Sequence, residues 1–102
     1  MYRASDHREH EEWLEEMERA ADALELDATA RSRAVDLFLT TVPDDDRSKR
    51  SALAASLYVG ALVSGQERSQ TAVAEATDVS RLTIQQRWKD LLEEAGLEAP
   101  DW

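Results

Sequence analysis

Apolar residues recur along the chain at the three- and four-residue spacing of amphipathic helices, and no segment alternates in the way that is typical of a β-strand. An acidic first helix is predicted over about residues 6–26, because Asp6 and Glu9 form a capping signal ahead of an apolar series. The members of that series are Trp13, Met17, Ala20, Ala21 and Leu24. A second helix is predicted from Asp27 to Val42, where Pro43 and three aspartates end the pattern.

The segment from Ser48 to Ser64 is apolar nearly all round, with Ser56 as a polar interruption. A helix without a polar face is a buried one, so we expect this helix at the centre of the fold, where Gly60 and several alanines admit close neighbours. The apolar run within it has 12 residues, fewer than the roughly 20 that a membrane-spanning helix needs. We therefore expect a core helix that Gly65 ends, and no membrane span.

Two further helices are predicted toward the C-terminus. Ser69 is placed to cap a helix over Gln70–Thr77, and Ser80 to cap a helix that Gly96 stops. Between them, Asp78 stands where a tight turn needs a left-handed residue, a conformation that Asp tolerates. The buried stripe of the last helix is predicted to be Ile84, Trp88, Leu91 and Ala95. The expected fold class is all-α, with five helices.

Size and composition fit one folded domain. Of the 102 residues, 42% are hydrophobic and 33% are charged, and the 3 Gly and 2 Pro are too few for a linker or a disordered chain. The absence of Cys excludes disulfides, thiolate zinc sites and a cysteine nucleophile. Because the N-terminus also lacks the apolar region of a secretory signal, we expect a soluble, cytoplasmic protein.

Charge is distributed unevenly along the chain, whose formal net charge is -10. Residues 1–46 carry 14 acidic and 5 basic side chains, whereas residues 47–89 carry 7 basic and 3 acidic ones. One surface is therefore expected to be basic on an otherwise acidic protein. The widely spread acidic excess and the scarcity of lysine favour adaptation to a salt-rich cytoplasm, as in halophilic archaea, over an ordinary acidic mesophilic protein.

The segment from Gln70 to Leu92 has the layout of a helix-turn-helix, a corner that serves DNA binding in some proteins and only packing in others. With the predicted stripe buried, the opposite side of the last helix exposes Ser80, Arg81, Leu82, Gln85, Gln86 and Lys89. Arg and Gln side chains can bond guanine and adenine edges, Lys suits a phosphate, and Leu can contact a thymine methyl group. These six residues are the candidate DNA-binding set.

No arrangement in the sequence points to catalysis or to a bound cofactor. His7 and His10 are three residues apart, but no third firm ligand accompanies them, so we expect no metal site. The chain has no Ser/His/Asp arrangement and no glycine-rich loop that could hold a phosphate. We therefore expect no enzymatic activity and no cofactor.

Three segments resemble a known family. Val79 to Glu94, with the sequence VSRLTIQQRWKDLLEE, looks like the last helix of the second cyclin-like repeat of archaeal transcription initiation factor B, a relative of eukaryotic transcription factor IIB. Arg47-Ser48 followed by Ala52 to Tyr58 is similar to the central-helix signature of that family, and Gln70 to Ala76 is similar to its fourth helix. The resemblance extends over residues 20–95.

This resemblance implies a single cyclin-like domain over residues 1–102, a five-helix box with a helix-turn-helix within 69–95 and a short tail at 97–102. It also implies that the last helix reads promoter DNA beside the TATA box, with TATA-binding protein and RNA polymerase as candidate partners. The positions that match the family pattern are Val79, Ser80, Thr83, Arg87 and Lys89. Departures at Arg81, Leu82, Gln86 and above all Gln85, where arginine is common, leave the preferred DNA sequence open.

Two functions stay open at this level. The first is a DNA-binding transcription regulator, favoured by a candidate set that contains no acidic residue. The second is a protein–protein interaction module of the basal transcription machinery without sequence-specific DNA binding, which the net charge favours. Because there is no Cys for a zinc ribbon and room for only one repeat, we expect a stand-alone regulator or a piece of a longer protein, of open oligomeric state.

Overall fold

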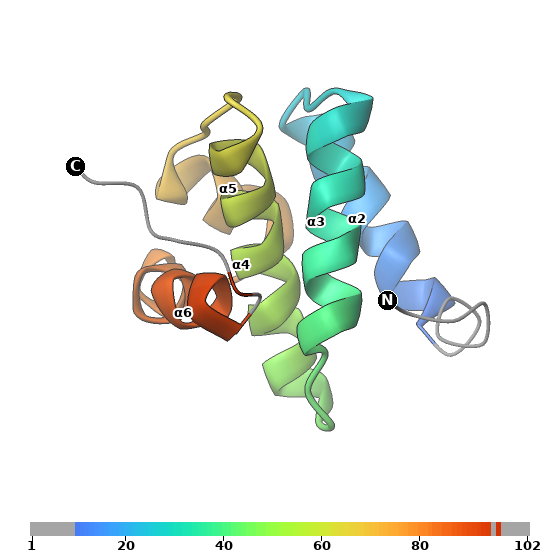
Figure 1. Ribbon diagram of the computed structural model, residues 1–102, viewed down its shortest axis with the longest axis vertical. Coiled ribbons are helices and arrows are strands. Elements are labelled where there is room, and N and C mark those ends of the chain that lie inside the picture. Colours follow the sequence, from blue (N-terminus) through green and yellow to red (C-terminus); the bar gives the residue numbers. More distant parts are fainter. Residues whose placement is uncertain (1–9, 95, 97–102) are drawn as a thin grey trace.

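The computed structural model describes residues 10–94 and 96, and within them every regular element is a helix (Figure 1). The helices are α2 (Glu11–Ala23), α3 (Ala28–Thr41), α4 (Asp46–Val63), α5 (Gln70–Thr77) and α6 (Arg81–Glu94). The predicted all-α fold with five helices is therefore confirmed. No helix in this part of the chain is long and apolar enough to cross a membrane.

Helix α4 is the centre of the fold, as its apolar sequence predicts. Every residue from Ala52 to Ala61 is buried, and α4 packs against each of the other four helices. Figure 1 shows α4 running between α3 on one side and α6 on the other. The helix begins two residues before the predicted start at Ser48, because the Asp45 carboxylate accepts a 2.8 Å hydrogen bond from the Ser48 backbone N–H and caps its first turn.

Helices α3 and α4 approach each other closely at Gly60. A Cβ atom at this position would lie 2.9 Å from both the Cβ and the backbone nitrogen of Ala34. Ala34 is itself completely buried. Only a residue without a side chain fits at this crossing, as the small residues of α4 led us to expect.

Helix α2 is shorter than the predicted helix over residues 6–26. It begins at Glu11, and the predicted cap Asp6 lies outside the described residues. At its other end Glu25 adopts a left-handed conformation with φ of 56°. The Leu26 N–H then donates to the Ala21 carbonyl at 3.0 Å, a bond that closes the helix end and turns the chain toward α3.

Arg68 joins the loop between α4 and α5 to the turn that follows α2. Its Nε donates to the Leu24 carbonyl at 2.8 Å, and its two terminal nitrogens donate to the carbonyls of Glu25 at 3.2 Å and Gln66 at 2.9 Å. One guanidinium thereby satisfies carbonyl groups from two loops more than 40 residues apart in sequence. A single lysine ammonium could not span these acceptors, because it lacks the planar fork of donors.

The core under α6 is aromatic and aliphatic. Trp88 is buried and meets the Tyr58 ring of α4 edge-on, with 5.5 Å between ring centroids. Ile84 and Leu91 are buried beside it, which confirms three members of the predicted stripe, while Ala95 lies outside the described residues. Trp102 and the rest of the predicted tail at 97–102 lie outside them as well.

Candidate nucleic-acid interface

Helices α5 and α6 are joined by a turn of three residues, 78–80. Asp78 is left-handed, with φ of 57° and ψ of 39°, which confirms the conformation predicted for it. The Val79 N–H donates to the Ala74 carbonyl at 3.2 Å, so the end of α5 is closed by the same kind of bond as the end of α2. This turn fixes the direction in which α6 leaves α5.

Both helices of the corner carry the serine caps predicted for them. The Ser69 side chain accepts from the Ala72 N–H at 3.0 Å, and the Ser80 side chain accepts from the Thr83 N–H at 3.1 Å. The Ser80 and Thr83 hydroxyls are also 2.7 Å apart and share a hydrogen bond. Ser80 is therefore exposed, as predicted, but its hydroxyl already stabilises the first turn of α6.

The outer side of α6 is as exposed as the periodicity predicts. All six candidate residues are solvent-exposed: Ser80, Arg81, Leu82, Gln85, Gln86 and Lys89. Leu82 is 61% exposed, a large apolar side chain on a polar surface. The opposite side of the helix packs into the core, so the exposed residues form one continuous strip along α6.

Two candidate side chains have contacts that the sequence did not reveal. The Gln70 side-chain amide of α5 donates to the Gln85 Oε1 at 2.6 Å. A bidentate contact with adenine uses both the oxygen and the nitrogen of a glutamine, and Gln70 already occupies one of the two acceptor positions of the Gln85 oxygen. Lys89 lies with its ammonium 5.5 Å from the centroid of the Trp88 ring, which holds the lysine against α6.

The arginines on the α2 side of the molecule form ion pairs with carboxylates of the protein itself. Arg31 pairs with Glu18 at 2.8 Å and with Asp22 at 2.6 Å, and these carboxylates, Asp22 above all, raise its pKa above the ordinary arginine value. Arg50 of α4 pairs with Glu16 at 3.1 Å. The guanidinium groups of Arg31 and Arg50 are thus already bound to carboxylates, and that of Arg68 to carbonyl groups, so they are poorly placed to bind a polyanion.

Several arginines on and near α6 are not paired in this way. Arg81 and Arg87 of α6, and Arg47 in the first turn of α4, make no side-chain hydrogen bond or ion pair with any described residue. The same holds for Arg33, which is exposed on α3. Of the four described arginines without such a partner, three therefore lie on α6 and the neighbouring end of α4.

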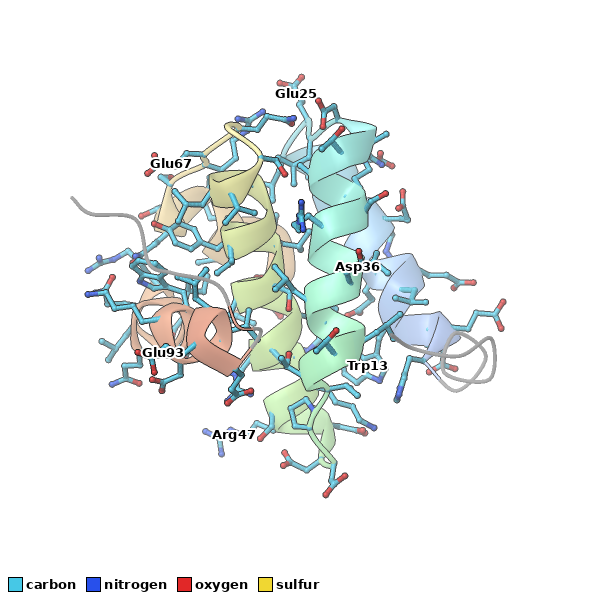
Figure 2. The ribbon with its side chains drawn as sticks, in the orientation of Figure 1. Trp13, Glu25, Asp36, Arg47, Glu67 and Glu93 are labelled. Atoms are coloured by element: carbon cyan, nitrogen blue, oxygen red, sulfur yellow. The ribbon has the colours of Figure 1, made fainter. Side chains whose placement is uncertain are left out.

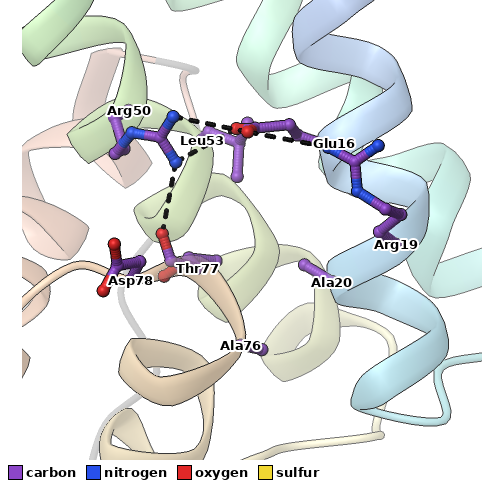
Figure 3. Close-up of a pocket in the computed structure, with 8 residues that line it drawn as sticks. All are labelled: Glu16, Arg19, Ala20, Arg50, Leu53, Ala76, Thr77 and Asp78. Carbon is purple, nitrogen blue, oxygen red and sulfur yellow. Dashed lines mark hydrogen bonds and ion pairs between the residues drawn. The ribbon is translucent and has the colours of Figure 1, made fainter.

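A hollow of about 400 Å³ lies on a different side, between α2, α4 and α5 (Figure 3). Arg50 crosses it, pairing with Glu16 and placing its Nη1 atom 3.5 Å from the Thr77 carbonyl oxygen. The same guanidinium stacks 5.5 Å from the centroid of the Trp13 ring. The positive charge of Arg50 is thus paired with the negative charge of Glu16 inside the hollow. Among the residues described there is no cluster of three metal-ligating side chains.

Comparison with known proteins gives a consistent result. Residues 8–94 match the family model described as "Transcription factor TFIIB repeat". The chain is 30% identical over 90 residues to transcription initiation factor IIB 2 of Thermococcus kodakarensis, a match that takes in 85% of this chain and 29% of that protein. It is 32% identical over 83 residues to transcription initiation factor IIB of Pyrococcus abyssi, with 78% of this chain and 28% of that protein covered.

A third relative is transcription initiation factor IIB of Archaeoglobus fulgidus, which is 33% identical over 79 residues, or 74% of this chain and 24% of that protein. The chain thus spans less than a third of the length of each of these three relatives. All three are archaeal. The family-model match over residues 8–94 covers all five described helices and extends to the end of α6.

Proposed function

Because this chain belongs to the family of transcription factor TFIIB repeats, we propose that it is a transcription regulator that binds promoter DNA through α6. The observation that carries this proposal is the separation of the cations. On the α2 side Arg31 and Arg50 are paired, whereas Arg81 and Arg87 of α6 and Arg47 at the adjacent end of α4 have no ion pair or side-chain hydrogen bond with a described residue. The two lysines of this region do have contacts, Lys49 with Asp46 at 3.9 Å and Lys89 with the Trp88 ring. Phosphate attraction supplies a large share of the affinity of a protein for DNA, so unpaired cations are the group that DNA binding needs.

In this proposal α5 and α6 act as a helix-turn-helix, with α6 in the major groove. Arg81 and Gln86, exposed and without internal partners, are suited to base edges, and Lys89 is suited to a phosphate. Leu82 presents an apolar surface that a thymine methyl group can cover. Ser80 stands at the start of the helix, where the residues of a recognition helix that contact bases are found. Gln85 can join the contact through its free side-chain NH2 and the second lone pair of its oxygen.

The acidic remainder of the molecule fits this proposal at high salt. We propose that the acidic surface is an adaptation to a salt-rich cytoplasm, where the Debye length falls to about 3 Å at 1 M ionic strength. Repulsion between the α2 carboxylates and DNA is then screened over the width of the protein. The relatives are named transcription initiation factors, so TATA-binding protein and RNA polymerase are the partners we propose for this chain.

The test is a titration of labelled promoter DNA and of a scrambled duplex at molar KCl, with and without TATA-binding protein. Arg81→Ala should cost about 1–3 kcal/mol in binding and reduce the preference for promoter over scrambled DNA, because a base contact is lost. Lys89→Ala should weaken both duplexes alike and lower the salt slope by about one. Arg33→Ala removes the same charge from α3 and should change neither the affinity for the two duplexes nor the preference between them.

The alternative is an interaction module that kept the fold without reading DNA. If this alternative holds, both duplexes should be bound equally weakly by the wild type, Arg81→Ala and Lys89→Ala. The two substitutions should then change only the recovery of TATA-binding protein or polymerase in a pull-down. Equal weak binding by all four proteins to both duplexes would therefore reject the DNA-reading proposal.

A further inference from the structure

A groove separates the first turns of α4 from the outer side of α6, and we propose that it seats a phosphate group of the DNA backbone between Arg47 and Arg87. The inference rests on the proposed function and adds to it a contact made by a helix other than the recognition helix. The groove encloses about 270 Å³, and its lining residues are Arg47, Ser48, Ser51, Thr83, Gln86, Arg87 and Asp90. In Figure 2, Arg47 projects from the first turn of α4, away from Asp36 on α3.

The two arginines have donors without acceptors. Neither guanidinium has a hydrogen bond or an ion pair with a described residue, and the Arg87 Nε is shut off from solvent without any acceptor. A buried donor without a partner raises the free energy of the molecule until an acceptor is supplied. Arg87 is half-buried and lines the groove, so part of its side chain packs against the protein there.

The chemistry of the lining selects a phosphate oxygen. A planar guanidinium presents paired N–H donors that match two oxygens of a phosphate, and two arginines line this groove. The Ser48 N–H in the first turn of α4 is not part of the site, because it already donates to the Asp45 carboxylate. The side chains, not the helix terminus, carry the proposed contact.

The position of the groove favours a backbone phosphate over a free anion. Gln86 lines the groove and also belongs to the exposed strip of α6 that is proposed to read bases. The phosphates of both strands border the major groove, which is about 12 Å wide, so a helix inserted there has a backbone on each flank. The groove lies on such a flank, and α4 supplies a second anchor for it.

Asp90 makes the proposal testable in both directions. Its exposed carboxylate lines the same groove and opposes an anion there. Removing an arginine should therefore weaken DNA binding, and removing Asp90 should strengthen it. The outer surface of α3 offers matched controls for both changes in charge, since Arg33 and Asp36 are exposed and distant in the fold from the groove.

The experiment titrates the promoter and scrambled duplexes with the wild type and variants of the full chain over a range of KCl concentrations. Arg47→Gln and Arg87→Gln should each weaken both duplexes roughly tenfold, the size expected for a charged hydrogen bond, without changing the preference between them. Each should lower the slope of log K against log salt by about 0.9. Asp90→Asn should tighten binding, and Arg33→Gln and Asp36→Asn should leave it unchanged.

Arg87→Lys separates a structural role from a phosphate contact. It keeps the charge but loses the fork, so it should keep the salt slope and lose part of the affinity, with an unchanged thermal melt. The groove proposal is overturned if Arg47→Gln and Arg87→Gln bind like Arg33→Gln while Arg81→Ala loses base preference, an outcome that leaves the proposed function standing. Failure of the wild type to bind either duplex overturns both proposals.

Discussion

Replacing Gly60 with alanine tests whether the close crossing of α3 and α4 sets the geometry of the fold. The new Cβ would lie 2.9 Å from the Cβ of Ala34, 2.9 Å from its backbone nitrogen and 3.0 Å from its Cα. Two of these three atoms belong to the backbone, so no rotation of a side chain relieves the contact. The two helices must move apart, and every residue packed between them must adjust.

The magnitude follows from two opposing effects. Overpacking of a well-packed core costs about 1–3 kcal/mol, and contact with backbone atoms places this site toward the upper end. Alanine is favoured over glycine inside a helix by about 1 kcal/mol. The free energy of unfolding should therefore fall by about 1–2 kcal/mol, which lowers Tm by roughly 5–15 °C in a domain of this size.

Urea denaturation followed by circular dichroism measures this loss directly. The double variant Ala34→Gly with Gly60→Ala should recover little of it, because both contacts with the backbone of residue 34 stay and a glycine inside α3 costs about 1 kcal/mol. If Gly60→Ala is as stable as the wild type or more so, the helices separate without cost, and the argument that the crossing requires glycine is wrong.

Three further outcomes follow from the helix ends and from the charge. Glu25→Gly should raise the free energy of unfolding by about 1 kcal/mol, because glycine takes the left-handed conformation at position 25 without the strain of a Cβ; an unchanged urea midpoint would contradict this. Hydrogen bonds with the Gln66 side chain and the Ala30 backbone N–H lower the pKa of Asp27 below its ordinary 3.8, so the stability it contributes is complete above that pH and is lost as the pH falls through the lowered value. Acid unfolding of Asp27→Asn should therefore show a weaker dependence on pH in that range than acid unfolding of the wild type. Thermal melts should fall steeply from molar to millimolar KCl as the 14 acidic residues of positions 1–46 lose screening, whereas a constant Tm would favour an ordinary mesophilic protein.

Periodicity and capping chemistry were enough to predict most of the architecture. The all-round apolar sequence of α4 made it the central helix, and Ser69 and Ser80 marked the starts of α5 and α6 through bonds to residues three positions on. The exposed strip of α6 followed from the burial of Ile84, Trp88 and Leu91 alone. These are local properties, which a single sequence encodes directly.

The features that the sequence did not predict depend on contacts between distant residues. Glu25 in the left-handed region has no local signal, since a glutamate there is held by the closure of α2 and by Arg68 from the loop before α5. The bond between Gln70 and Gln85 requires α5 and α6 to be placed first. Arg47 and Arg87 are 40 positions apart, and only the packing of α6 on α4 brings them to one groove.

The separation of paired from unpaired cations also gives the molecule an electrical polarity that its net charge conceals. Helix α2 carries six acidic residues against one basic residue, and it lies on the far side of α3 and α4 from α6 (Figure 1). The protein measures 26 Å along its shortest axis, several times the Debye length of about 8 Å at physiological ionic strength. An approaching polyanion therefore interacts mainly with the face nearest to it. The first turns of α6 attract the polyanion and α2 repels it, so the protein experiences a torque that turns α6 toward the polyanion. As salt rises this torque fades, so the charge distribution orients an approaching polyanion at low salt and leaves its approach unoriented at high salt.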